Sequence, residues 1–304
     1  MSVARLLLNQ WFMRVEKRRM RNAIGPMELR YNFEKQARLL FHAPRGTTKR
    51  WTALGGVDTL ELTPRHVQQD RVILYFHGGG FVFGSPETHA ALAAQLAHRV
   101  KGRALLPRYR LAPEAVFPAA ALDVRAAWDG LIADGVDPAH VVIGGDSAGG
   151  ALAFGLLAQL CSEGAPMPGA VFGFSPLTDM THSGESFVAN AECDVILPAE
   201  RAGEMAEIFL NGQPPDDPRC SPLHGQFHGA PPTWFTVGDT EILRDDARRL
   251  ADVLRRDGAP VNLVERHDLP HVWPLMHNIL PEARETLDAL AEWIKQVQGW
   301  PTES

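Results

Sequence analysis

The sequence predicts an α/β fold in which helices flank a mostly parallel central sheet. Short β-rich runs recur along the chain, and longer stretches with helical periodicity lie between most of them. Strands that alternate with helices form βαβ units with right-handed crossovers. The 304 residues are 45% hydrophobic and 22% charged, which suits a globular protein with a sizeable core. Ligands of such sheets bind beyond the carboxyl ends of the strands.

Two kinds of segment alternate along the chain. The expected strands are 54–62, 71–76, 103–107, 141–144, 170–175, 233–237 and 261–264. The expected helices are 90–100, 118–134, 150–163, 245–257 and 283–298. Residues 1–50 and about 183–220 do not fit this alternation and read as helices with loops between them. We expect these two segments to form a helical cap over the ligand end of the sheet, with about 51–182 and 221–304 as the main domain.

The N-terminal segment predicts an amphipathic helix. Its apolar residues alternate with Arg and Lys at roughly helical spacing; they are Leu6, Leu7, Trp11, Met13 and Val15. The segment has no small-residue cleavage site and its apolar run is too short to span a bilayer. We expect it to pack as a lid over the protein's own core rather than on a membrane surface, which is the alternative.

The strand expected at 71–76 ends in His77 and three successive glycines. Consecutive glycines are conformationally costly unless the backbone itself must approach something closely. The backbone N–H groups of Gly78 and Gly79, with that of Ala148, could stabilise an oxyanion. His77 is expected to orient this loop rather than act as a base. The alternative is a flexible glycine turn.

The strand expected at 141–144 leads into GDSAG at 145–149, directly before a helical stretch. Glycines let the backbone turn sharply and bring strand and helix close together. Such a turn would expose the hydroxyl of Ser147. Taken alone, the pattern fits equally well an incidental serine in a glycine-rich connection or a phosphate-binding loop at a helix N-terminus.

A nucleophilic serine requires a base, since its hydroxyl is a weak nucleophile at neutral pH. His271 falls in a loop after the strand expected at 261–264, and Pro270 prevents a regular helix there. His267 and His271 form an i, i+4 pair that could suggest a metal. The proline and the lack of a third ligand argue against a metal site.

The acid that orients the base is expected after the strand at 233–237. The candidates in GDTEILRDD are Asp239, Glu241, Asp245 and Asp246. Asp245 suits the N-cap or first turn of the next helix. Spacing alone leaves Asp239 and Glu241 as alternatives.

Charge and cysteine content predict the kind of partner. The net charge of −6 argues against nucleic acid or anionic membranes and favours a small molecule. Cys161, Cys193 and Cys220 are widely spaced without C-x-x-C pairing, so neither disulfides nor a zinc site is expected. We expect reduced thiols and a cytoplasmic location.

Several motifs together carry a family resemblance. They are HGGG at 77–80, YRLAPE at 109–114, FPAAALD at 117–123, GDSAGG at 145–150, SPLTDMTHSGES at 175–186, DPRCSPL at 217–223, GDTEILRDD at 238–246 and LPHVW at 269–273. In this order they resemble the hormone-sensitive-lipase-like family of α/β-hydrolases, whose members include bacterial carboxylesterases. The resemblance runs from about residue 70 to the end of the sequence. It implies the α/β-hydrolase fold, in which serine, acid and histidine follow in that chain order.

The resemblance also implies the role of each site residue. It assigns the nucleophile to Ser147 and the base to His271. The implied oxyanion donors are Gly78, Gly79 and Ala148. The family's usual acid, an Asp in a D-P-L-R-D stretch, aligns here with Glu241, and Asp239 is the possible substitute. YRLAPE, Asp123, Asp146 and Asp179 are interpreted as scaffold.

The implied activity is that of a serine carboxylesterase that hydrolyses short- to medium-chain acyl esters through an acyl-enzyme, without metal or cofactor. One alternative is a catalytically silent ligand-binding protein, like the plant gibberellin receptors, which resemble this family but lack the histidine. Another is a membrane-associated lipase. A homodimer could form through an exposed strand near 259–265.

Overall fold

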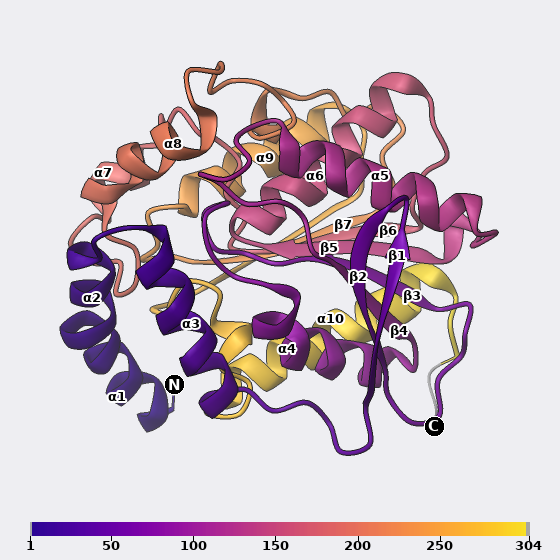
Figure 1. Ribbon diagram of the computed structural model, residues 1–304, viewed down its shortest axis with the longest axis horizontal. Coiled ribbons are helices and arrows are strands. Elements are labelled where there is room, and N and C mark those ends of the chain that lie inside the picture. The colour runs from indigo at the N-terminus through magenta and orange to yellow at the C-terminus, as the bar shows by residue number, and fades with distance from the viewer. Residues whose placement is uncertain (1, 302–304) are drawn as a thin grey trace.

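The computed structural model describes residues 2–301 and contains one eight-stranded sheet (Figure 1). The strand order is β1-β2-β4-β3-β5-β6-β7-β8. The strands are β1 (Thr48–Leu54), β2 (Val57–Thr63), β3 (Val72–Phe76), β4 (Arg103–Pro107), β5 (Val141–Asp146), β6 (Ala170–Phe174), β7 (Thr233–Gly238) and β8 (Val261–Arg266). Pairing is parallel from β4 to β8 and antiparallel for β1–β2 and β2–β4. The predicted α/β fold is confirmed.

The strand expected at 54–62 is wrong in its extent, because two strands form a hairpin there. Gly55 and Gly56 both have positive φ and make the two-residue turn between Leu54 and Val57. β1 lies at the sheet edge with most of its side chains exposed. Its polar sequence therefore lacks the apolar signal by which the other strands were found.

Five long helices cover the two faces of the sheet. They are α4 (Pro86–Val100), α5 (Ala119–Ala133), α6 (Ala148–Glu163), α9 (Arg244–Arg256) and α10 (Pro281–Gln298). One apolar core joins α5, α6 and α9 to one face, and a second joins α4 and α10 to the other. Successive strand residues such as Ile73 and Leu74 enter opposite cores, as the period of two requires. α4 begins before its predicted start because Ser85 and Thr88 form a capping box ahead of it.

The remaining helices come from the two segments outside the alternation. They are α1 (Val3–Trp11), a π-helical segment (Phe12–Glu16), α2 (Lys17–Asn22), α3 (Pro26–Leu40), α7 (Glu185–Ala189) and α8 (Ala202–Leu210). Short 3-10 turns occur at Pro138–His140, Ala199–Arg201, Pro222–His224 and Trp273–Met276. Figure 1 shows α1–α3 and α7–α8 gathered on one side of the molecule, away from the β1–β2 hairpin. Within the described residues, no helix is both long and apolar enough to cross a membrane.

Candidate active site

Ser147 lies in a strained turn between β5 and α6. Its φ of 51° and ψ of −120° are unfavourable for a residue with a side chain. Two hydrogen bonds hold this conformation, from Ser147 N to Phe174 O (2.9 Å) and from Leu177 N to Ser147 O (3.0 Å). The flanking glycines are required, because a Cβ on Gly145 would lie 2.3 Å from the carbonyl oxygen of Gly149. The geometry is that of a nucleophile elbow.

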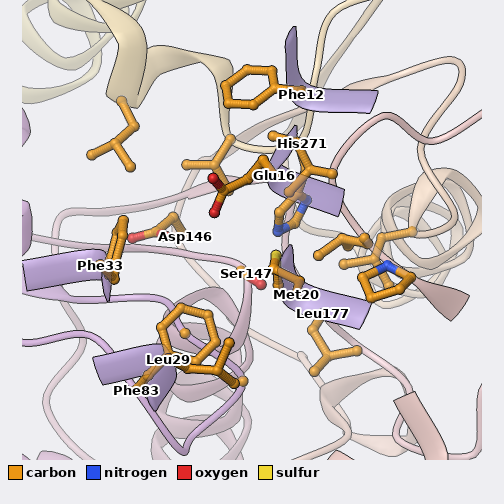
Figure 2. Close-up of a pocket in the computed structure, with 18 of the residues that line it drawn as sticks. Phe12, Glu16, Met20, Leu29, Phe33, Phe83, Asp146, Ser147, Leu177 and His271 are labelled. Atoms are coloured by element: carbon orange, nitrogen blue, oxygen red, sulfur yellow. The ribbon is translucent and has the colours of Figure 1, made fainter. Parts of the chain in front are cut away.

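Ser147 and His271 line the same cavity, which has a volume of about 230 Å³. Figure 2 shows both on its wall, together with Phe12, Glu16 and Met20 of the N-terminal segment. Most of the lining is apolar and comes from several elements, including Leu8, Trp11, Leu29, Phe33, Phe81, Phe83, Leu177, Met180, Met205 and Leu275. The cavity therefore suits an apolar small molecule with one reacting polar group.

His271 is paired with Glu241. Nδ1 of His271 lies 2.6 Å from Oε2 of Glu241, and both side chains are buried. The other carboxylate oxygen of Glu241 accepts hydrogen bonds from Ser175 Oγ (2.8 Å) and Gly238 N (2.6 Å). Burial alone would lower the pKa of His271, but the hydrogen bond and charge of Glu241 outweigh it and raise that pKa above its ordinary value. The contact with Glu241 fixes the orientation of the imidazole ring.

Asp239 contacts a different histidine. Its Oδ2 lies 2.7 Å from Nδ1 of the exposed His267, and its Oδ1 accepts a hydrogen bond from Asp268 N (2.8 Å). Glu241 therefore lies beside His271, whereas Asp239 lies beside His267 and the loop that precedes His271. Among residues 2–301, no group of three His, Cys, Asp or Glu side chains is arranged to hold a metal ion.

The expectation that Gly78 donates to an oxyanion needs correction. Its N–H donates to Asp146 Oδ1 (3.0 Å), and Gly78 does not border the cavity. Gly79 and Gly80 do border it, and within the described part of the chain the N–H of neither has an acceptor. Among the described residues, the two glycines that border the cavity and keep an N–H group without an acceptor are therefore Gly79 and Gly80, one residue later than the expected pair Gly78 and Gly79.

Asp146 holds the glycine loop in place, as expected of a scaffold residue. Besides the Gly78 N–H, it accepts a hydrogen bond from Tyr75 Oη (2.7 Å), and His89 Nε2 lies 3.3 Å from its second oxygen. Burial alone would raise the pKa of Asp146, but the charge and hydrogen bond of His89 and the Tyr75 hydrogen bond lower it. The carboxylate therefore stays charged and oriented beneath the loop.

His77 has the surroundings of an orienting residue. Its Nδ1 lies 2.8 Å from Gly78 O, and Tyr109 Oη donates to its carbonyl oxygen (2.6 Å). Burial lowers the pKa of His77 to about 3, so the ring is neutral at physiological pH. Tyr109 belongs to YRLAPE, which thus braces the glycine loop from behind.

Three residues around Glu241 were not singled out from the sequence. They are Ser175, Asn190 and Asp194. Asn190 Nδ2 donates to the carbonyl oxygens of Asp239 (3.0 Å) and Glu241 (2.8 Å), and Asp194 Oδ2 accepts from Ile242 N (3.0 Å). Asn190 and Asp194 lie in the segment read as cap, where no local pattern signals a contact with a loop about fifty residues later. Ser175 opens the SPLTD motif, which was the available signal.

Comparisons with known proteins agree with this geometry. A family model described as an alpha/beta hydrolase fold matches residues 73–275. An acetyl-hydrolase of Streptomyces hygroscopicus is 36% identical over 232 residues, which cover 76% of this chain and 78% of the relative. An esterase of Acinetobacter venetianus is 32% identical over 224 residues, covering 73% of this chain and 74% of the relative.

Solved structures are similar over nearly the whole chain. The crystal structure of an esterase from the bacterial hormone-sensitive lipase family has a TM-score of 0.92 and 33% identity, and covers 98% of this chain and 99% of that one. The structure of EstE5 soaked with p-nitrophenyl butyrate has a TM-score of 0.91 and 31% identity, and covers 98% and 100%.

Proposed function

This chain belongs to the hormone-sensitive-lipase-like family of α/β-hydrolases and is a serine carboxylesterase. On this basis we propose which residues perform the hydrolysis. Ser147 is the nucleophile, His271 the general base and acid, and Glu241 the residue that orients the imidazole. The proposed oxyanion donors are the backbone N–H groups of Gly79, Gly80 and Ala148. The observation that carries the proposal is the 2.6 Å contact between His271 and Glu241 beside the cavity that Ser147 lines.

The proposed reaction proceeds in two steps. Ser147 Oγ forms a bond to the ester carbonyl carbon while its proton passes to Nε2 of His271. The carbonyl oxygen becomes an oxyanion bound by the backbone N–H groups. The C–O bond to the alcohol then breaks, the alcohol takes the proton from His271, and the acyl group stays on Ser147. Water repeats the sequence and releases the acid.

The proposed substrate is an ester of a short- to medium-chain acid. A cavity of about 230 Å³ with largely apolar walls accommodates a compact acyl group and excludes water around it. The soaking of EstE5 with p-nitrophenyl butyrate supports the choice of acyl lengths to test.

Release of p-nitrophenol from acetate, butyrate, octanoate and palmitate esters tests this function. We expect Ser147→Ala to lose several orders of magnitude in turnover on the preferred ester. Absence of any turnover above that of Ser147→Ala, on all four esters, would favour the silent ligand-binding alternative.

Location and assembly stay predictions. Cys161, Cys193 and Cys220 have free thiols, which is compatible with the proposed cytoplasmic location.

The proposed dimer would form through β8, which is the last strand of the sheet and is partly exposed. Such a dimer would appear as twice the monomer mass in sedimentation. Turnover that rises sharply on liposomes would favour the lipase alternative.

A further inference from the structure

The first helix contacts the loop that carries His271, and the second contacts the segment that holds the loop of Glu241. Arg5 and Asn9 are four residues apart on α1, so they share one face of the helix. Both are buried, although they are polar. Burial of such polar side chains lowers the stability of the fold unless they are hydrogen-bonded. Their hydrogen-bond partners therefore show which part of the structure they hold in place.

Arg5 and Asn9 both bind Asp268, at a distance of about 260 residues along the chain. Arg5 Nη1 lies 3.0 Å from Asp268 Oδ2 and donates to the carbonyl oxygen of His267 (3.2 Å). Asn9 Nδ2 donates to the carbonyl oxygen and to Oδ1 of Asp268 (3.0 and 3.1 Å). These contacts hold both the backbone and the side chain of Asp268.

Asp268 lies three residues before His271 in the loop after β8. Its φ is 53°, in the left-handed region that is uncommon for residues other than glycine. Asp239 accepts its N–H from the other side, and Pro270 limits the freedom of the short connection that remains. We therefore expect a shift of Asp268 to move His271.

Lys17 of α2 makes the corresponding contact toward Glu241. Its buried ammonium donates to the carbonyl oxygens of Ala191 and Asp194, both at 2.7 Å. The same segment binds the acid loop, through Asp194 to Ile242 N and through Asn190 to the carbonyl oxygen of Glu241. α2 thus reaches the acid loop through one intervening segment.

We propose that Arg5, Asn9 and Lys17 are positioning residues for the His271–Glu241 pair, so that the seating of the N-terminal helices sets the rate of the chemical steps. This inference rests on the proposed function. It goes beyond the lining of the cavity, since none of the three side chains borders the cavity.

The test compares charged positions within the N-terminal helical segment 3–22. Arg5→Met and Lys17→Met remove the contacts, whereas Arg14→Met and Arg18→Met remove exposed charges nearby. With p-nitrophenyl acetate, we expect kcat to fall about tenfold or more for the first two variants, as for loss of a charged hydrogen bond. The KM of Arg5→Met and Lys17→Met should change less than twofold. The kcat and KM of the two control variants should also change less than twofold. Wild-type kcat in Arg5→Met and Lys17→Met, or a loss confined to KM, would overturn the proposal.

The pH profile separates positioning from a general loss of folded protein. Glu241 raises the pKa of His271, and Asp194 and Asp146 also face it. If Arg5→Met moves His271 away from Glu241, the acid limb of kcat/KM should shift to lower pH. A smaller fraction of folded protein would lower the profile without shifting it, so an unshifted limb contradicts the inference.

If Arg5→Met does not fold, Asp268→Asn alone tests the same contact, because the Asp268 side chain is 31% exposed. A wild-type kcat in Asp268→Asn would then overturn the inference. If Arg5→Met folds, the two single variants and the double variant form a cycle. Coupling between them supports a shared route to His271, and additive losses of kcat overturn it. A wild type inactive on every ester would instead reject the proposed function itself.

Discussion

One buried hydroxyl joins the proposed acid to the loop of the proposed base. Ser175 Oγ donates to Glu241 Oε1 (2.8 Å) and accepts a hydrogen bond from Val272 N (3.1 Å), the residue after His271. Ser175 itself has a positive φ of 46° and is fully buried. At the residue scale, the site thus depends on a side chain that takes no part in the proposed chemistry.

Ser175→Ala should lower both activity and stability. The change leaves Val272 N–H buried without its acceptor and removes one donor to Glu241, at a cost of about 1–3 kcal/mol in free energy of unfolding. We expect kcat/KM to fall about tenfold. Ser162→Ala, at an exposed position of α6, is the matched control. Steady-state kinetics measure kcat/KM, and urea denaturation measures the free energy of unfolding. Equal values of both quantities in Ser175→Ala and Ser162→Ala would contradict the role of Ser175 in holding Glu241 and the His271 loop.

The acid can be identified by amide substitution. Glu241→Gln keeps the shape but removes the negative charge that stabilises the imidazolium, so we expect kcat to fall roughly 10³-fold or more. Asp239→Asn alters only the contact with His267 and the loop before His271, so its loss should be smaller. A severe loss in Asp239→Asn alone would reject Glu241 as the acid.

The pH dependence follows from the same pair. The base must be neutral to accept a proton, so kcat/KM declines as pH falls through the pKa of His271. Because Glu241 raises this pKa, the wild-type decline should begin above the ordinary histidine value of about 6.5. The residual activity of Glu241→Gln should decline at lower pH. Coincident acid limbs in pH–rate profiles would show that Glu241 does not act on His271.

At the scale of elements, the elbow depends on close approach between α6 and β3. A Cβ on Gly149 would lie 2.0 Å from the carbonyl oxygen of Phe76, which is backbone and cannot move aside alone. We expect Gly149→Ala to lower the free energy of unfolding by about 1–3 kcal/mol. Gly203→Ala in α8 has no atom within 4 Å of its new Cβ and should raise it by about 0.5–1 kcal/mol. Urea denaturation of both variants tests the contrast.

Elements with a strong local signal were predicted well from the sequence. The buried parallel strands and the long flanking helices show continuous apolar runs or helical periodicity, and GDSAG predicted a sharp turn between strand and helix. The edge strand β1 was missed because its side chains are mostly exposed. The displacement within HGGG was missed because it depends on Asp146 accepting the Gly78 N–H, a contact between residues 68 positions apart.

At the scale of the whole molecule, the contacts between distant segments were not predicted from the sequence. Family resemblance covered the chain from about residue 70, whereas the contacts of Arg5 and Lys17 join the first helices to loops far along the chain. Such contacts have no periodicity and no motif. They become visible once the fold brings the N-terminal segment against the ends of the strands.

The entire fold also maintains the strain at Ser147. A glycine adopts φ of 51° and ψ of −120° readily, so Ser147→Gly should relieve about 1–3 kcal/mol of strain, against about 0.5–1 kcal/mol lost to the freer unfolded chain. We expect a net gain of about 1 kcal/mol in free energy of unfolding together with loss of turnover. Ser147→Ala also loses the hydroxyl but retains a Cβ, so it should be less stable than Ser147→Gly. Equal urea midpoints for the two variants would show that the elbow stores no strain, and the conformation of Ser147 would then need no support from the surrounding sheet.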